Sequence, residues 1–329
     1  VIPIKDFFDC EENGIEDYTK RIDMTIVNKN QEHEKIDRGV YNGYKNTKKI
    51  KTMYGYELEC SDNHPIMAQK QNGEIDFVLA SDLKVGDKVL ISTKNDIWGD
   101  NLDIKTFNVP SKTKRLNCAK FSINQLDEDI AKFLGYFLAA GVIIDDNQVF
   151  FYHNDDYVVK EYIKLLNKLG FEEKCKKTRK SNKVSFMREY FGFWLEGLGY
   201  GYKESSRKKI PACIMSAPKE IVASFLQGLF EAGAIIETEN GRVSMTTKSK
   251  DLAEQVHLLL LNFGIISSLR QRKFKNKSGI YYCLKIHGEN IDKFKEEINF
   301  ASMSKRRKLT NICRYYRYIN VKNTKMIIF

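Results

Sequence analysis

Residues Phe133–Ile143 read FLGYFLAAGVI, a stretch with helical spacing whose C-terminal end offers only Ala139-Ala140-Gly141. A related stretch, LQGLFEAGAII, occupies residues 226–236. Both follow acidic residues placed where a first helical turn is expected, which favours a helix in each case. Side chains of alanine and glycine carry no chemistry, so the two stretches point first to packing.

Both stretches contain the pattern Gly-x-x-x-Ala, as Gly135 with Ala139 and Gly228 with Ala232. Residues i and i+4 share one face of a helix, so each helix has a flat strip that another backbone can approach closely. One such strip would be ordinary core packing. Two strips at equal spacing predict that the helices pair and that their C-terminal ends meet.

The segments around these helices recur in the same order: helix, strand, helix and basic hairpin. The first set is 127–141, 149–153, 156–171 and 172–186, and the second is 217–236, 241–247, 251–265 and 267–286. Matching pairs stand 94 residues apart, among them Val149 with Val243, Lys176 with Arg270, and Lys183 with Lys277. This regularity predicts an internal duplication, with repeats at about 120–212 and 213–300, and therefore a monomer with an internal pseudo-dimer.

The composition favours a polyanionic partner. The chain has 329 residues, and 54 Lys and Arg against 43 Asp and Glu give a net charge of +11. Such an excess is typical of nucleic-acid binding or serves solubility alone. The seven cysteines form no CxxC pair, which argues against a zinc site or a disulfide framework. No apolar run reaches the ~18 residues of a membrane span and no signal peptide is evident, which predicts no membrane partner and an intracellular protein of the cytoplasm or nucleus.

Basic and polar side chains gather on three segments that we predict to bind double-stranded DNA. The strand GRVSMTTKS alternates its polar residues onto one face, and each hairpin carries a basic run. The predicted DNA-binding residues are Lys176, Lys177, Arg179, Lys180, Lys183, Arg242, Ser244, Thr246, Lys248, Arg270, Arg272, Lys273, Lys275 and Lys277. A solvated charged face is the alternative, because runs of lysine commonly have no other role.

Residues 133–141 and 226–234 resemble the two copies of the LAGLIDADG motif of homing endonucleases, and the likeness extends over about 115–310. The resemblance implies a domain at 115–300 of two αββαββα-type repeats, with the motif helices at the interface between halves and strands lying on duplex DNA. In that family an Asp or Glu before the last Gly of each motif holds a divalent metal, usually Mg²⁺.

The two acid positions of the motif are Ala140 and Gly233 in this chain, so Mg²⁺ binding and cleavage are predicted to be lost or impaired. Glu231 should point away from the site, because it lies about 200° around the helix from Gly233. Asp145 and Asp146 could substitute only if the chain folds back towards the helix end.

The first hundred residues contain short β-prone runs separated by turns, and no amphipathic helix is expected before about residue 127. Residues 39–91 resemble the Hint, or intein, splicing domain. Ser61-Asp62-Asn63-His64 matches its Thr-x-x-His block, which implies that His64 activates a peptide bond and that the Ser61 hydroxyl helps to hold it.

The resemblance to inteins implies three parts: a Hint-like domain at 1–110, the endonuclease-like domain, and a return to the Hint-like domain at 301–329. Tyr318–Thr324 resembles the strand of the C-terminal splicing block. The terminal Cys or Ser nucleophile and the final His-Asn are absent from this sequence, so we expect that this polypeptide alone does not splice.

The sequence thus predicts an α+β protein with a β-rich domain and a duplicated endonuclease-like domain. The favoured function is that of an intein-derived, DNA-binding relative of site-specific endonucleases with doubtful cleavage. Two alternatives remain: a non-enzymatic nucleic-acid-binding protein, and a protein-splicing element that carries the endonuclease-like domain as a passenger.

Overall fold

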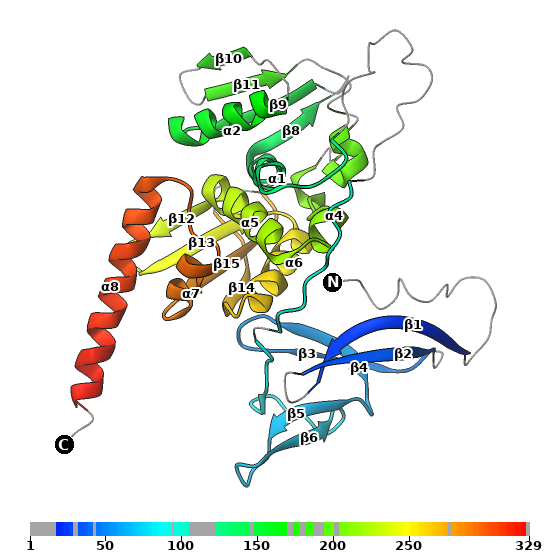
Figure 1. Cartoon of the computed structure of the whole chain (residues 1–329). Coiled ribbons are helices and arrows are strands. Elements are labelled where there is room, and N and C mark those ends of the chain that lie inside the picture. The colour runs from blue at the N-terminus through cyan, green and yellow to red at the C-terminus, as the bar shows by residue number, and fades with distance from the viewer. Residues whose placement is uncertain are drawn as a thin grey trace. The chain divides into compact units, whose positions relative to one another are not determined.

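A computed structural model of the chain describes residues 18–28, 32–41, 44–93, 95–104, 123–144, 148–169, 174–177, 182–186, 192, 194–200, 204–275 and 278–326. The chain divides into two compact units, Val1–Ile97 and Trp98–Phe329, each of which has its own internal contacts (Figure 1).

The first unit is built of strands, as the sequence predicts. The strands are β1 (Tyr18–Val27), β2 (His33–Tyr41), β3 (Thr47–Lys51), β4 (Glu57–Ser61), β5 (Pro65–Gln69), β6 (Ile75–Leu79) and β7 (Lys88–Val89). They form three small antiparallel sheets with the orders β1-β2, β3-β4 and β6-β5-β7. Among the described residues of this unit, the buried apolar side chains are those of Tyr56, Ala68 and Ala80.

The second unit contains two copies of one arrangement, so the predicted duplication is confirmed. The first copy comprises α1 (Glu128–Ala140), β8 (Gly141–Ile144), β9 (Gln148–His153), α2 (Asp156–Lys168), β10 (Lys174–Lys177) and β11 (Asn182–Phe186). The second comprises α5 (Lys219–Gly233), β12 (Ala234–Glu237), β13 (Arg242–Thr247), α6 (Lys250–Asn262), β14 (Ser267–Arg272), β15 (Tyr281–His287) and α7 (Asn290–Glu297). Between them lie η4 (Glu196–Tyr200), η5 (Ser205–Arg207) and α4 (Ala212–Met215).

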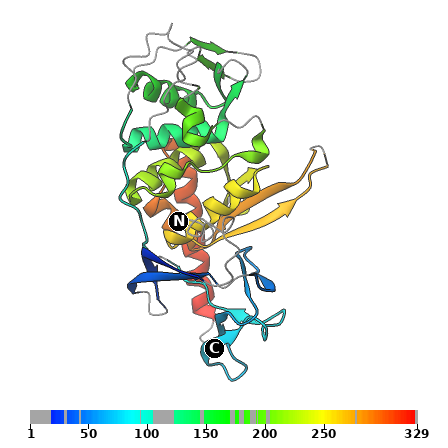
Figure 2. The same ribbon diagram turned by 90° about the vertical axis from the view of Figure 1, so that its right-hand side faces the viewer.

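Each copy builds a four-stranded antiparallel sheet of the same topology, β8-β9-β11-β10 in the first and β12-β13-β15-β14 in the second. The helices pack on one face of each sheet. In the first copy Phe151 of β9 stacks on Tyr162 of α2, with ring centroids 3.9 Å apart. In the second copy Val243 and Met245 of β13 are buried, which leaves the alternating residues on the outward face. Figure 2 shows the β14–β15 hairpin extending away from the helices.

Helix α1 begins where the sequence predicts. The side chain of Asp127 caps it by accepting a hydrogen bond from the Ile130 backbone N–H at 2.7 Å. Strands β8 and β12 follow α1 and α5 without a loop, and sequence analysis had no separate strand for either. The other predicted helices and strands of the repeats are present among the described residues, whereas residues 170–173 and 178–181 of the first repeat lie outside them.

Helix α8 (Met303–Met326) corrects the prediction of a strand at Tyr318–Thr324, because this segment is helical. The aromatic and β-branched residues of RYYRYINV suggested a strand, yet Leu309, Ile312 and Cys313 are buried at helical spacing in the preceding turns. Helix propagates readily from a docked first turn. The start of α8 packs against α7 and β12, so this part of residues 301–329 lies in the second unit and not in the β-rich one.

The buried imidazole of His257 in α6 should make the stability of the fold depend on pH. The side chain is 2% exposed, its Nδ1 lies 2.6 Å from the Ser267 hydroxyl, and burial lowers the pKa of the imidazole to about 4. The unfolded chain binds a proton below its ordinary pKa of about 6.5, whereas the folded chain does not. The free energy of unfolding should therefore be highest at neutral pH and fall by roughly 3 kcal/mol as the pH drops from 6.5 to about 4.

The substitution His257→Asn should remove most of that pH dependence, measured by urea unfolding at about pH 7.5 and about pH 4.5. His287→Asn, which changes an exposed histidine of β15, is the matched control and should keep the wild-type dependence. An unchanged slope in His257→Asn would contradict the assignment.

Within the described residues, no helix combines the length and the apolar character needed to cross a membrane.

Candidate nucleic-acid interface

Helices α1 and α5 lie against each other at their two glycines, as the sequence predicts (Figure 1). A Cβ atom added to Gly135 would stand 2.1 Å from the Phe225 carbonyl oxygen, and one added to Gly228 would stand 2.2 Å from the Lys132 carbonyl oxygen. These contacts are between backbones, so no side chain larger than hydrogen fits at either position.

The C-terminal ends of the two helices meet. A Cβ atom added to Gly233 would lie 3.3 Å from the Cβ of Ala139, and Ala140, half-buried, packs against the core beside it. Ala140 and Gly233 therefore occupy one location between the repeats, which confirms the predicted meeting of the helix ends.

The residues at this location do not fit a divalent metal. Neither Ala140 nor Gly233 has an oxygen-bearing side chain, and Mg²⁺ requires such ligands. No group of three or more His, Cys, Asp or Glu side chains that could hold a metal ion occurs in the part of the chain that the structure describes. Asp145 and Asp146 lie outside the described residues.

Glu231 is an anchor for the segment that follows α7. Its side chain is fully buried, and Oε2 accepts hydrogen bonds from the backbone N–H groups of Ala301 at 2.7 Å and Ser302 at 3.1 Å. The carboxylate is thereby committed to holding the start of α8.

Two lysines that the sequence did not predict as site residues cap the ends of the motif helices at equivalent carbonyls. Lys208 donates through Nζ to the carbonyl oxygens of Leu138 at 2.6 Å and Gly141 at 3.5 Å. Lys305 donates to those of Glu231 and of Ala234, the latter at 2.9 Å. Leu138 corresponds to Glu231, and Gly141 to Ala234, in the duplication.

The environment of these lysines explains their pKa values. Burial lowers the pKa of Lys208 to about 8 and also lowers that of Lys305, against the opposing charge of Glu231. Cations at helix C-terminal ends are stabilised by the helix dipole. The two half-buried ammonium groups thus face the partial negative charge of the helix ends.

His153 of β9 links the two repeats at the same place. Its Nδ1 accepts a hydrogen bond from the Asp155 backbone N–H at 3.0 Å, so the proton of the neutral ring is on Nε2. Nε2 donates to the carbonyl oxygen of Ala232 in α5, 3.1 Å away. The second repeat has Thr247 at the equivalent position, with its Oγ1 accepting from Ser249 N at 3.1 Å, so the histidine is a feature of the first repeat alone.

The outward face of the second sheet carries predicted DNA-binding residues together. Ser244 pairs with Lys285, which pairs in turn with Ser268 of β14. Thr246 pairs with Cys283, which pairs in turn with Arg270. Arg270, Arg272, Lys273 and Lys275 are exposed, and the Nζ of Lys248 lies 5.5 Å from the ring centroid of Tyr281. Lys277 lies outside the described residues.

Lys285 belongs to this face and was not predicted from the sequence. Partial burial lowers its pKa, and the positive charges of Arg242 and Arg272 lower it further. The alternation CLKIH around Lys285 could have identified it, because Leu284 and Ile286 are the buried neighbours.

In the first sheet the backbone register pairs Lys176 with Lys183, and Lys177 with Asn182. Lys183 also pairs with Tyr152 of β9, which is the position that Thr246 has in the second repeat. Lys183 therefore corresponds to Cys283 and not to Lys277 as the constant offset suggested, because the second hairpin has longer strands. Arg179 and Lys180 lie outside the described residues.

Ser61 and His64 lie in the turn between β4 and β5 of the first unit. The His64 backbone N–H donates to the Ser61 carbonyl oxygen at 3.0 Å, and the Ser61 hydroxyl donates to Asn63 Oδ1 at 2.8 Å. The imidazole of His64 is exposed. The structure thus keeps the predicted pair within one turn.

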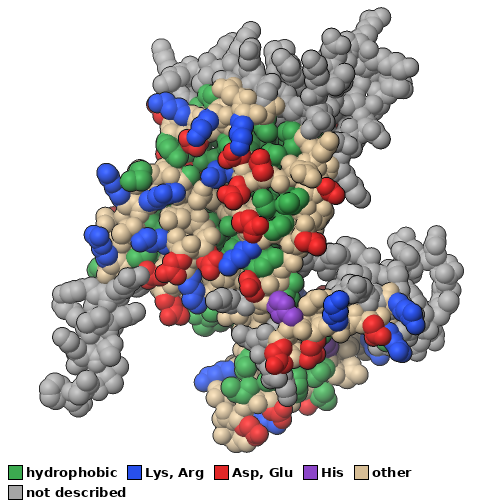
Figure 3. Space-filling model, in the orientation of Figure 1, with side chains coloured by type: hydrophobic (Ala, Val, Ile, Leu, Met, Phe, Trp, Pro, Cys, Tyr) green, Lys and Arg blue, Asp and Glu red, His purple; other side chains and the backbone are tan. Residues whose placement is uncertain are grey.

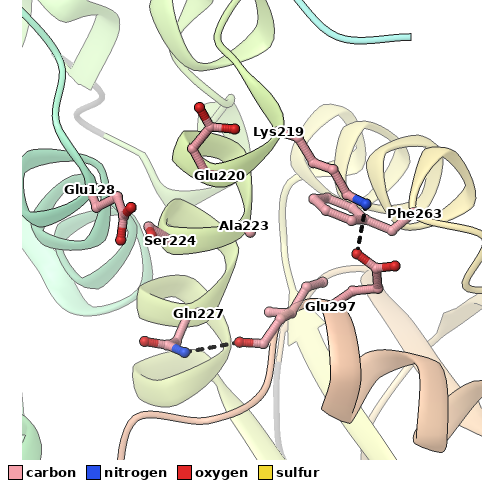
Figure 4. A pocket seen from close by; sticks show the side chains of 9 residues that line it. Glu128, Lys219, Glu220, Ala223, Ser224, Gln227, Phe263 and Glu297 are labelled. Carbon is pink, nitrogen blue, oxygen red and sulfur yellow. Dashed lines mark hydrogen bonds and ion pairs between the residues drawn. The ribbon is translucent and has the colours of Figure 1, made fainter. Parts of the chain in front are cut away.

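A pocket of about 360 Å³ lies at the opposite, N-terminal end of α5, where Glu128, Glu220 and Glu297 line it (Figure 4). Lys219 Nζ is 2.9 Å from Glu297 Oε2, and Gln227 donates to the Ile298 carbonyl oxygen at 2.9 Å. Figure 3 shows acidic side chains over the middle of this face of the second unit. Their negative charge would repel a phosphate backbone.

Comparison with known proteins agrees with the duplicated fold. Residues 220–299 match the family described as LAGLIDADG-like domain, and residues 130–189 match the WhiA LAGLIDADG-like domain. A crystal structure of I-DmoI in complex with DNA and Mn is similar at a TM-score of 0.39 and 18% identity, covering 54% of this chain and 98% of that chain.

Two similar proteins come from Methanocaldococcus jannaschii. Its replication factor C small subunit is 30% identical over 270 residues, and its probable translation initiation factor IF-2 is 30% identical over 230 residues. The matches cover 80% and 66% of this chain but only 13% and 19% of those proteins. The family matches at residues 130–189 and 220–299 show that the second unit of this chain contains two LAGLIDADG-like domains.

Proposed function

We propose that the chain binds double-stranded DNA through the outward faces of its two four-stranded sheets. The observation that carries this proposal is the outward face of β12–β15, where Arg270 and Arg272 are exposed and Lys285 lies beside them. The opposite face of the same sheet is covered by helices, so the basic face is the surface available to a partner. A net charge of +11 supports the proposal of a polyanionic partner such as DNA.

The duplication supports a pseudo-symmetric mode of binding by one polypeptide. The helix pair α1–α5 joins the repeats, and each repeat contributes one sheet, so a single chain can contact two successive parts of a duplex. Contacts from lysine and arginine to phosphates supply affinity, while sequence is read by side chains that reach base edges.

We propose further that the chain has lost metal-dependent cleavage. Ala140 and Gly233 supply no ligand for Mg²⁺, the cofactor that the family resemblance implies, and Lys208 and Lys305 place positive charge at the helix ends. The chain would then act as a DNA-binding protein, with the catalytic positions Ala140 and Gly233 as remnants of an endonuclease.

An origin as an intein is supported by the pattern of similar proteins. Most of this chain matches a minor part of a replication factor and a minor part of a probable translation initiation factor. A segment shared by proteins with such different names is typical of an inserted mobile element. The adjacency of Ser61 and His64 supports the same origin, with a splicing role for the first unit.

The splicing proposal has a direct test. The complete reading frame around this chain should yield a shortened, ligated product when expressed, and His64→Ala should leave the precursor intact. The intact mass distinguishes the two results. A wild-type precursor that stays full length would contradict splicing without affecting DNA binding.

DNA binding should weaken steeply with salt. If six or more phosphates are contacted, affinity for a duplex should fall by about 1000-fold or more between about 50 and 200 mM salt. The triple substitution of Arg270, Arg272 and Lys275 by glutamine should reduce the slope of log K against log salt concentration by roughly 3. Fluorescence anisotropy with a labelled duplex measures both quantities.

The matched control neutralises Lys160, Lys164 and Lys168, three exposed lysines of α2 on the helical side of the first sheet. This variant loses the same charge and should keep the wild-type slope. Equal effects of the two triple variants, or an affinity that does not respond to salt, would overturn the proposed interface.

A further inference from the structure

Glu237 occupies an unexpected position on the basic face of the second sheet. Among the residues of β12, β13, β14 and β15 it is the one carboxylate, and it pairs across the β12–β13 hairpin with Arg242. An isolated carboxylate on a surface for phosphates would lower affinity through like-charge repulsion. Glu237 therefore has a role other than general attraction of phosphates, namely in its contacts with neighbouring side chains.

The carboxylate of Glu237 holds Arg242 in a defined geometry. Its Oε2 accepts from Arg242 Nε at 2.7 Å and lies 2.6 Å from Arg242 Nη2. The same oxygen accepts from Asn240 Nδ2 at 3.1 Å, and Oε1 accepts from the Ser244 hydroxyl at 2.5 Å. The hydrogen bonds from Arg242 and Ser244 lower the pKa of Glu237 to about 2, so the carboxylate is ionised at neutral pH.

The contacts leave one edge of the guanidinium available. Arginine has five N–H donors in a planar fork, and Glu237 takes the edge formed by Nε and Nη2. The remaining edge, with Nη1 and the second N–H of Nη2, presents two parallel donors. That pattern matches the O6 and N7 acceptors that guanine displays in the major groove.

We propose that Arg242 reads a guanine in the major groove and that Glu237 is the positioning residue that holds it in the reading geometry. This inference rests on the proposed function, namely that the outward face of β12–β15 lies on duplex DNA. It adds base recognition at one residue to a surface whose other basic residues supply phosphate contacts.

The first repeat has no equivalent of the Glu237–Arg242 pair. Its backbone register pairs Ile144 with Gln148, which are the positions of Glu237 and Arg242. The two repeats therefore share these strands, but the pair of Glu237 and Arg242, here called the reading pair, belongs to the second repeat. A target recognised by the chain should accordingly be asymmetric, with the specified guanine in the half bound by the second repeat.

The test is selection of binding sites from a random-sequence duplex library with the full chain. The wild-type protein should enrich one guanine position, and Arg242→Lys should reduce preference at that position by about 10-fold or more, because lysine keeps the charge but has no fork. Glu237→Gln should relax the same position, because it keeps the size of the side chain but removes the charge that holds Arg242. Arg207→Lys, which alters an exposed arginine of η5 outside both sheets, should leave the enriched sequence unchanged.

The possible results separate this inference from the proposed function. A wild-type chain that binds no duplex at low salt would overturn both. Binding without any enriched guanine, or an enriched sequence that survives both Arg242→Lys and Glu237→Gln, would overturn the reading pair alone. A merely structural ion pair would lower the thermal midpoint of the variants without moving the selected sequence.

Discussion

Replacing Gly228 with alanine is expected to lower the free energy of unfolding of the second unit by at least about 3 kcal/mol. The added methyl group would stand 2.2 Å from the Lys132 carbonyl oxygen and 3.1 Å from the Tyr136 backbone nitrogen. Both obstacles are backbone atoms of a helix, which cannot rotate aside as a flexible side chain would. The helices must separate along their whole contact, and urea unfolding followed by circular dichroism would measure the loss.

Gly233→Ala is the matched control, since Gly233 is in the same helix, α5. Its added methyl group would meet only the Cβ of Ala139, at 3.3 Å. Replacing a helical glycine by alanine stabilises a helix by up to about 1 kcal/mol, so this variant should be as stable as wild type or slightly more so. Equal stability of the Gly228 and Gly233 variants would show that the helices do not touch through their backbones.

The helix pair could be predicted from the sequence because small residues at i and i+4 have few other uses when they occur twice. The capping lysines could not. Lys208 and Lys305 lie in the basic runs KKIP and SKRRK, where each lysine resembles its neighbours. Only the fold shows which ammonium reaches a helix end. The carbonyl partners of the two lysines occupy equivalent positions of the two repeats.

Two predictions, one of a strand and one of a residue equivalence, were wrong for different physical reasons. Tyr318–Thr324 was predicted as a strand from residues with high β propensity, but the buried turn of α8 at Leu309–Cys313 continues as a helix. The equivalence of Lys183 with Lys277 failed because β14 and β15 are longer than β10 and β11. A constant sequence offset cannot detect a change in hairpin length.

The pairing of Glu237 with Arg242 illustrates a further limit of sequence reasoning. Arg242 was predicted as a DNA-binding residue from alternation along one strand, which concerns that strand alone. The carboxylate that holds it comes from the neighbouring strand, five residues earlier, across the β12–β13 turn. Cross-strand neighbours are set by register, and register becomes certain only when the turn is known.

Restoring both motif acids should produce a nuclease. The double variant Ala140→Asp/Gly233→Asp places two carboxylates where the ends of α1 and α5 meet, and these supply the hard oxygen ligands that Mg²⁺ prefers. We expect Mg²⁺-dependent cleavage of a selected duplex at least about 100-fold faster than with the wild-type chain. Separation of cleaved and intact plasmid on a gel, with and without a chelator, measures it.

Charge, and not shape, should decide this result. Ala140→Asn/Gly233→Asn adds side chains of nearly the same size without a negative charge, and it should remain as inactive as wild type. Each single Asp variant should gain little, because one carboxylate alone supplies too few of the oxygen ligands that Mg²⁺ requires. Rapid Mg²⁺-dependent cleavage by the wild-type chain would contradict the loss of function, and a selected site bound but left intact by the double Asp variant would contradict the assignment of positions 140 and 233 as the former metal ligands.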